Sequence, residues 1–182
     1  MPPSAPSPTA RLAFRPWHAD DAEALLDMYG RPEVYRFLGA SPSPVVDVDD
    51  ARQRIARWST RIRDGQGVWA IVRREVPEAR PVGTALLVEL PRSDGAASDA
   101  VEIGWHLHPD WWGQGYATEA GAALVATAAA RGQGTVRAVL YPENHGSAAV
   151  CERLGMTMVG ITGEWYGVEL VEYRLDLARL SR

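Results

Sequence analysis

The sequence of 182 residues has very little cysteine, and Cys151 is its single example. One cysteine excludes a disulfide within the chain and favours a cytoplasmic setting. The sequence also has no run of about 18 apolar residues, so it predicts no membrane span. Residues 1–10 (MPPSAPSPTA) lack the basic start and apolar stretch of a secretory signal, and their Pro, Ser and Ala content predicts a disordered leader.

Basic residues form no long block, and the formal net charge is −4. This balance argues against nucleic acid as the main partner. It suits a cationic amine as ligand, although a charge of this size is also usual for solubility alone. Hydrophobic residues make up 46% and charged residues 23% of the chain, which is ordinary for a globular protein. The length fits one α/β domain, which we expect over residues 11–182.

Hydrophobic periodicity predicts the order of helices and strands. After Asp20 and Asp21, apolar residues recur at helical spacing from Ala22 to Tyr29, and a further helical pattern begins at Val48. The patterns indicate helices near 22–29, 32–38, 48–62, 115–131 and 146–154, and strands near 12–16, 68–74, 82–90, 101–109, 135–141, 156–160 and 168–177. We therefore expect a mixed α/β sheet with helices packed on it.

The strongest local signal is residues 108–120 (HPDWWGQGYATEA), where a strand ends, a glycine-rich turn follows and a helix begins. Gly113 and Gly115 let the backbone turn sharply and approach a ligand without a Cβ in the way. The first N–H groups of the helix lack internal partners, so with the helix dipole they form an anion site. The segment predicts phosphate or pyrophosphate binding between Gly113 and Thr118, although an ordinary strand-to-helix turn also uses glycines. It lacks the Lys-Ser/Thr of a nucleotide P-loop and the third glycine of a dinucleotide loop.

This segment resembles the acetyl-CoA pyrophosphate loop of Gcn5-related N-acetyltransferases (GNATs). The family pattern Gln/Arg-x-x-Gly-x-Gly/Ala is matched by Trp112, Gly115 and Ala117, with Trp in place of Gln or Arg. The Trp form, followed by Tyr-Ala-Thr-Glu-Ala, is typical of the branch that resembles ribosomal-protein N-terminal acetyltransferases (RimJ/RimL-like). Because the loop binds through its amides, the substitution is compatible with the same role.

Two further segments extend the resemblance over nearly the whole chain. Residues 144–156 (NHGSAAVCERLGM) resemble the family signature Asn-x-x-Ser/Ala…Glu-Lys/Arg-x-Gly-Phe, with Met156 in place of Phe. Residues 12–26 (LAFRPWHADDAEALL) are similar to the Leu-x-x-Arg-Pro opening of the branch. The segments occur in the order that the family requires.

The resemblance implies the acyl-CoA N-acyltransferase fold, a mostly antiparallel central sheet of six to seven strands flanked by helices. It implies acetyl-CoA as co-substrate, no metal, and transfer of the acetyl group to a primary amine by direct attack in a ternary complex. The backbone from Trp105 to Leu107 would pair with the pantetheine arm and stabilise the oxyanion. The residues implied in cofactor binding are Trp105, Leu107, Trp112, Gly113, Gln114, Gly115, Tyr116, Ala117, Thr118, Asn144 and Ser147.

Ser147 is the candidate that the resemblance places at the CoA sulfur, as in the ribosomal-protein branch. Many other relatives carry a Tyr at the position of Cys151, and a cysteine is too short to replace it. Ser147 and Asn144 also suit plain roles, as a helix-start residue and as a cap or turn residue. For Cys151 we expect a buried apolar role rather than nucleophilic catalysis.

A proton must leave the amine, because alkyl amines are mostly protonated at neutral pH. Glu102 lies on the strand before the loop, where many relatives carry a basic carboxylate. Glu164 lies in a stretch where a Glu has been proposed as base in the ribosomal-protein branch. His106 should share a strand face with Glu102 and His108 and is a third candidate, and a water chain is a fourth. As metal ligands, His106 and His108 lack an evident third partner.

The sequence leaves the amine acceptor open. The branch resemblance favours a protein N-terminal amine, and a small amine such as an aminoglycoside, a polyamine or an amino-acid derivative is the alternative. Glu102, Glu164, Glu169 and Glu172 would suit a cation. We expect neither nucleic acid nor membrane as partner, and a monomer or homodimer. Two other classes stay open: a non-catalytic acyl-CoA-binding sensor or scaffold, since the Tyr is missing at Cys151, and a phosphate-binding domain unrelated to CoA.

Overall fold

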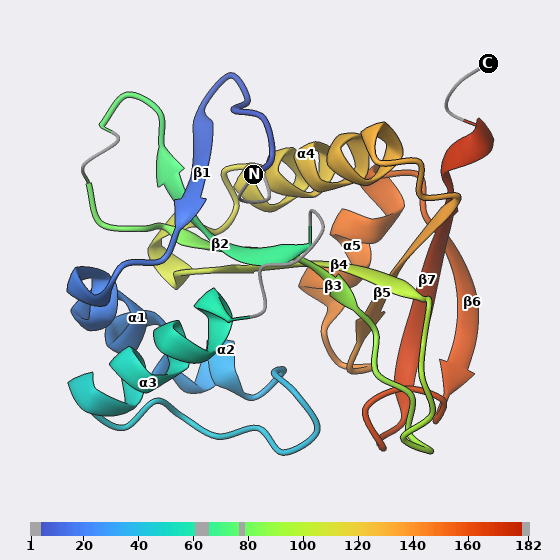
Figure 1. Cartoon of the computed structure of the whole chain (residues 1–182), viewed down its shortest axis with the longest axis horizontal. Helices are drawn as coiled ribbons and strands as arrows, with labels where there is room; N and C mark the ends of the chain where they lie inside the picture. Colours follow the sequence, from blue (N-terminus) through green and yellow to red (C-terminus); the bar gives the residue numbers. More distant parts are fainter. Residues whose placement is uncertain (1–4, 61–65, 77–78, 180–182) are drawn as a thin grey trace.

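The protein, a computed structural model, is described over residues 5–60, 66–76 and 79–179. A seven-stranded sheet with the order β1-β2-β3-β4-β5-β7-β6 forms its centre (Figure 1). Neighbouring strands run antiparallel except β4 and β5, which are parallel. This confirms the predicted mixed and mostly antiparallel sheet. The strands are β1 (Leu12–Pro16), β2 (Gly67–Arg73), β3 (Gly83–Glu89), β4 (Val101–Leu107), β5 (Thr135–Leu140), β6 (Thr157–Thr162) and β7 (Leu170–Asp176).

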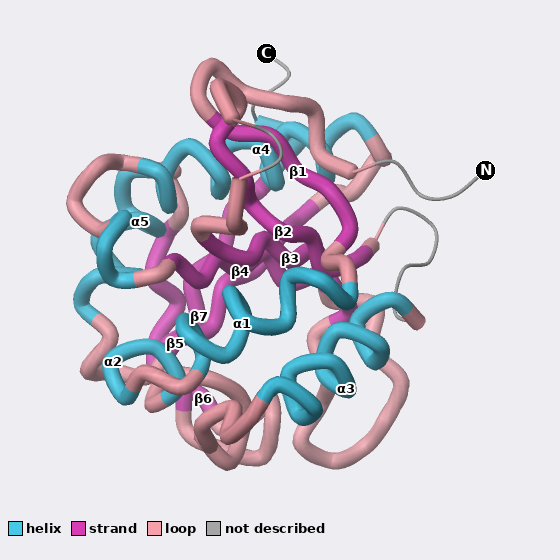
Figure 2. Tube along the Cα trace, turned by 90° about the vertical axis from the view of Figure 1, so that its left-hand side faces the viewer, coloured by secondary structure: helices cyan, strands magenta, loops and turns pink. Residues whose placement is uncertain are grey.

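Helices cover both faces of the sheet (Figure 1 and Figure 2). One face carries α1 (Ala22–Tyr29), α2 (Pro32–Tyr35) and α3 (Val48–Ser59), and the other carries α4 (Tyr116–Ala130) and α5 (His145–Arg153). Short 3-10 turns occur at η1 (Ala19–Asp21), η2 (Pro109–Trp111) and η3 (Leu177–Arg179). Within the described ranges, no helix combines the length and apolar content needed to cross a membrane.

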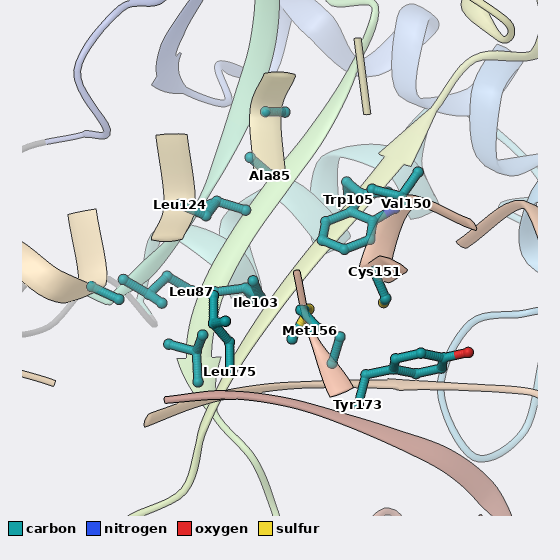
Figure 3. Close-up of a cluster of buried hydrophobic side chains, with 14 of the residues drawn as sticks. Ala85, Leu87, Ile103, Trp105, Leu124, Val150, Cys151, Met156, Tyr173 and Leu175 are labelled. Atoms are coloured by element: carbon teal, nitrogen blue, oxygen red, sulfur yellow. The ribbon is translucent and has the colours of Figure 1, made fainter. Parts of the chain in front are cut away.

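The two faces of β4 have different roles. Ile103 and Trp105 pack with Leu124 of α4 in the main hydrophobic core (Figure 3). Because successive residues of a strand point to opposite faces, Glu102 and His106 point to the face that α1 and α3 cover. The strand therefore supplies core residues on one side and polar residues on the other.

Small residues bring α4 close to the sheet. A Cβ on Gly121 would lie 2.6 Å from Cδ1 of Leu154 and 3.2 Å from the ring of Trp105. Glycine at this position therefore lets α4 approach both β4 and the end of α5. This packing fixes the first turn of α4 beside the end of β4.

The sheet is nearly divided between β4 and β5. The two strands pair at one position, Glu102 with Arg137. Beyond that pair, the backbone of Gly104–Leu107 on β4 and of Ala138–Leu140 on β5 does not join in a ladder. A space bounded by strand edges therefore opens at this point.

Some predicted boundaries differ from those observed. The helix expected at 32–38 is shorter, because α2 ends at Tyr35. The helix expected at 48–62 ends at Ser59, and Ile62 lies outside the described residues. The strand expected at 101–109 ends at Leu107, because Pro109 has no N–H to extend a ladder and opens η2 instead.

Candidate active site

A cavity of about 720 Å³ lies where β4 and β5 diverge. One wall is the stretch of β4 from Glu102 to Leu107, which includes Trp105, and the opposite wall is Ala138–Leu140 of β5. The turn before α4 and the first turn of that helix also line the cavity, as do the start of α5 and α2. Both sequence motifs that predict CoA binding thus border the same space.

The turn before α4 has the conformation that the glycines predict. Gly113 has a φ of 73° and Gly115 a φ of 79°, a region that residues with a Cβ rarely adopt. Gly115 is the N-cap of α4 and offers no side chain as cap, so the N–H groups of Tyr116, Ala117 and Thr118 lack intrahelical partners. These groups border the cavity, where they and the helix dipole favour an anion.

Trp112 holds the turn against the strand. Its indole Nε1 donates a hydrogen bond of 2.9 Å to the carbonyl of Leu107, the last residue of β4. The side chain remains 48% exposed and lines the cavity. At this position the indole thus fixes the path of the turn, while the amides that follow remain free to bind.

Arg11 supports the same turn from outside. Its guanidinium pairs with Glu119 at 2.6 Å, donates to the carbonyl of Gln114 at 3.0 Å and lies 4.6 Å from the ring centre of Tyr116. The side chain of Gln114 turns away to the carbonyl of Asp110 and does not line the cavity, unlike the other residues predicted to bind cofactor. The predicted role of Gln114 in cofactor binding is therefore limited to its backbone, and it stays a prediction.

Two residues of the predicted leader also contact this part of the molecule. Thr9 donates a hydrogen bond of 2.5 Å to Glu119, and Ala5 packs against the main core.

Asn144 and Ser147 form the start of α5. The side chain of Asn144 caps the helix by accepting a hydrogen bond of 3.1 Å from the Ser147 N–H. Both residues line the cavity. The Ser147 hydroxyl has no hydrogen-bond partner among the described residues, so it is available to a ligand.

Glu102 is a buried carboxyl group that lines the cavity. Its side chain receives a hydrogen bond of 2.5 Å from the Tyr166 hydroxyl, and the residue is only 8% exposed. Burial raises the pKa of Glu102 to about 7, against the opposing effect of the Tyr166 bond. A carboxyl group with this pKa exchanges protons near neutral pH.

His106 lies two residues beyond Gly104 on the same face as Glu102. Its Nδ1 is 2.8 Å from the hydroxyl oxygen of Tyr29, and that hydroxyl donates a hydrogen bond of 2.8 Å to Thr84. Burial, with a smaller effect from the nearby charge of Arg54, lowers the pKa of His106 to about 4. The imidazole is therefore neutral above about pH 5 and acts as a hydrogen-bonding group in a fixed orientation.

A second cavity of about 320 Å³ adjoins the first on the side of α1 and α3. Glu102 and His106 line both cavities, so they lie at the junction. The remainder of the second cavity is lined by aromatic, aliphatic and cationic residues. Its aromatic lining comprises Tyr29, Phe37, Trp58, Tyr141 and Tyr166, and its cationic lining comprises Arg54 and Arg57.

Glu164, a candidate base in the sequence, lines neither of the two cavities. It forms an ion pair of 2.7 Å with Arg92, and its side chain is 42% exposed. The residue of this stretch that reaches the site is Tyr166, which has a positive φ of 57°. That backbone turn directs the phenol to Glu102, and the sequence gives no signal for it beyond its place two residues after Glu164.

Cys151 is buried in the core near Trp105 and Tyr173 (Figure 3). Burial raises the pKa of its thiol to about 12, so it remains a neutral apolar group and not a nucleophile. His108 faces Asp27 at 3.3 Å rather than His106. In the part of the chain that the structure describes, no group of three His, Cys, Asp or Glu side chains is arranged to hold a metal.

Known proteins share both the sequence pattern and the fold. Residues 11–157 match the family model described as acetyltransferase (GNAT) domain. The uncharacterized N-acetyltransferase p20 of Bacillus licheniformis is 27% identical over 159 residues, which cover 86% of this chain and 85% of p20.

Solved structures agree with this match at the level of the fold. RimL, a ribosomal L7/L12 alpha-N-protein acetyltransferase solved with coenzyme A, is 18% identical and covers 94% of this chain and 97% of its own, with a TM-score of 0.73. YncA of Salmonella typhimurium, solved with its cofactor acetyl-CoA, is 21% identical and covers 91% of this chain and 94% of its own, with a TM-score of 0.66. From the family match and the geometry of the cleft, the chain belongs to the GNAT family of acetyl-CoA-dependent acetyltransferases.

Proposed function

We propose that the chain, as one domain over residues 11–182, transfers the acetyl group of acetyl-CoA to a primary amine by direct attack. The observation that carries this proposal is Glu102, a buried carboxyl group with a pKa of about 7 at the junction of two cavities. The larger cavity has the anion site for CoA, and the smaller one has room for an acceptor. A proton acceptor between them is what the reaction requires.

The fit to acetyl-CoA rests mainly on backbone groups. The free N–H groups of Tyr116, Ala117 and Thr118 suit the pyrophosphate. The strand edges from Trp105 to Leu107 and on β5 suit the amides of the pantetheine arm, because both edges have unpaired backbone groups. Substrate held in this way would have its thioester near Glu102 and Ser147.

In the proposed reaction the amine nitrogen forms a bond to the thioester carbonyl carbon, and the carbon–sulfur bond breaks. Glu102 accepts the proton that leaves the amine. A backbone N–H of the stretch Trp105–Leu107 stabilises the oxyanion. Ser147 donates a hydrogen bond to the departing sulfur, since its hydroxyl has no partner in the described part of the chain. Glu164 has no part in this scheme, because it lies beside Arg92 outside the cleft.

The acceptor that we place first is a protein N-terminal amine. The supporting observations are the fold shared with RimL, whose name states alpha-N-protein acetylation, and the branch resemblance of the loop. A small-molecule amine is the second acceptor to test. The sensor alternative rests on Cys151 in place of a Tyr. We place acetyl transfer ahead of it because a buried carboxyl group with a raised pKa, at the junction of two cavities, is typical of catalytic sites.

The test is a transfer assay with acetyl-CoA and a panel of intact ribosomal proteins, peptides and small amines. We expect one molecule of free CoA for each acetylated amine, detected by thiol titration and mass spectrometry. Binding of acetyl-CoA without any acetylated product from the panel would instead support the sensor. No preference for acetyl-CoA over simple nucleotides would support the unrelated phosphate-binding domain.

A further inference from the structure

We propose that the acceptor amine also carries a carboxylate, which Arg54 of α3 receives in the smaller cavity. This inference rests on the proposed function, because it assigns that cavity to the acceptor. It reverses the expectation of a purely cationic acceptor that the acidic residues suggested.

Arg54 is the first reason. Its side chain is half-buried and lines the smaller cavity. Among the described residues it pairs with no carboxylate, and it lies over the ring of Tyr29, 5.6 Å from the ring centre. A partly buried guanidinium without a counter-ion is costly unless a ligand supplies one, and its planar fork matches a carboxylate.

The position of Arg54 relative to the reacting groups is the second reason. Tyr29 contacts Arg54 through its ring and His106 through its hydroxyl, at 2.8 Å. The charge of Arg54 is also close enough to lower the pKa of His106. One phenol side chain therefore separates the cation from the junction where the amine must lie. An acceptor with its amine near Glu102 could reach Arg54 with a carboxylate a few bonds away.

The remaining charges of the cavity agree with this assignment. Arg57, one turn further along α3, is a second cation in the lining. Of the described residues that line this cavity, Glu102 is the only acidic one. Two of the acidic residues that suggested a cationic ligand are engaged elsewhere, with Glu164 on Arg92 and Glu172 on Arg137 and Arg174. The acceptor site thus presents more positive than negative charge.

Two sources can supply this chemistry, a free amino acid or a peptide with an acidic residue near its N-terminus. The experiment measures kcat/KM for matched acceptors in two arms: serine against serinamide, and a Ser-Asp peptide against the corresponding Ser-Asn peptide. Spermidine serves as the cationic comparison. Rates are expressed per unprotonated amine, because the amine pKa differs within the first pair.

We expect the carboxylate member to be preferred by about tenfold or more in at least one arm, as for a charge-assisted hydrogen bond. Arg54→Gln should bring that ratio close to one by lowering the rate with the carboxylate acceptor, and Arg54→Lys should restore part of it. Arg52→Gln is the matched control on the same helix, because Arg52 pairs with Asp49 at 2.9 Å and lines neither cavity. The arm in which the carboxylate acceptor is preferred shows whether the acceptor is a free amino acid or a peptide.

Equal rates within both pairs, faster turnover of spermidine, or a preference that survives Arg54→Gln would each overturn the inference while acetyl transfer itself stands. Absence of transfer to every acceptor would overturn the proposed function as well. Thermal unfolding of Arg54→Gln and Arg52→Gln shows whether the two variants are equally folded. If Arg54→Gln is unstable, the preference for the carboxylate acceptor is compared between Arg54→Lys and wild type instead. Lysine keeps the positive charge but lacks the planar guanidinium, so a preference equal to that of wild type would overturn the inference.

Discussion

The proposed phosphate end of the cleft, residues 112–118, is built from backbone, whereas the proposed acceptor end, formed by Tyr29, Arg54, Glu102, His106 and Tyr166, is built from side chains. At the proposed phosphate end, glycine conformations and free N–H groups would provide the binding chemistry. At the acceptor end, each side chain comes from a different part of the chain except Glu102 and His106, which share β4. The comparison indicates that substitutions should act on cofactor affinity at one end and on chemistry and selectivity at the other.

The largest expected effect is at the phosphate end. Gly115→Asp forces a residue with a Cβ into a φ of 79° and puts negative charge where the phosphates bind. We expect acetyl-CoA affinity to fall by about 100-fold or more, roughly 3 kcal/mol. Isothermal titration with acetyl-CoA measures this. Affinity equal to that of wild type would show that the turn does not bind the pyrophosphate.

Glu102→Gln tests the acceptor end. We expect kcat to fall by about 100-fold or more, because general-base catalysis is lost while acetyl-CoA affinity is retained. In wild type, kcat/KM per unprotonated amine should rise with pH through about 7, since the carboxyl group accepts a proton only when ionised. The Gln variant should lose this rise. A pH profile that is unchanged in Glu102→Gln would remove Glu102 as the base.

The free energy of unfolding gives a control for the Glu102→Gln variant. The pKa of Glu102 is raised on folding, so its contribution to the free energy of unfolding is fully present below its unfolded pKa and is lost as pH rises through about 7. At pH 8 the Gln variant should therefore be at least as stable to urea as wild type. A stable but inactive variant separates catalysis from folding.

Ser147→Ala should have a smaller effect. Removal of one hydrogen-bond donor to the sulfur should lower kcat about tenfold and leave the KM for acetyl-CoA nearly unchanged. Helix α5 should remain intact, because its cap uses the backbone N–H of residue 147 and the side chain of Asn144. Steady-state kinetics checks the division between kcat and KM, and an unaltered kcat would exclude Ser147 from the reaction.

The smallest change in rate is expected for Tyr166→Phe. The Tyr166 hydroxyl acts to lower the pKa of Glu102, so its loss should move the rise of kcat/KM to higher pH, by about one pH unit. The rate at pH 7 should fall several-fold and recover at pH 9. A loss of rate that is equal at all pH values would contradict this positioning role.

The difference between the two ends also explains what the sequence could predict. The phosphate end depends on glycine spacing before a helix, which is a local property, and Gly113, Gly115 and the start of α4 were predicted from it. Strand β1 and helix α1 were also predicted at their observed bounds, because their hydrophobic periodicity is local as well.

The acceptor end depends on how α1, α3 and the segment before β7 pack on β4. Nothing in the order of residues indicates that Tyr29, Arg54 and Tyr166 meet Glu102 and His106. For the same reason the stretch 163–167 was identified, but the residue that faces the site is Tyr166 and not Glu164.

The single pair between β4 and β5 has a consequence for order in the molecule. Strands β1 to β4 and strands β5 to β7 form two parts of the sheet, which pair with each other at Glu102 and Arg137. A ligand with a row of amides, bound between these two parts of the sheet, would supply the hydrogen bonds that the two strand edges do not make with each other. The co-substrate would then serve as a temporary eighth strand. In each turnover it would connect the two parts of the sheet while it is bound, and the connection would be lost when it is released.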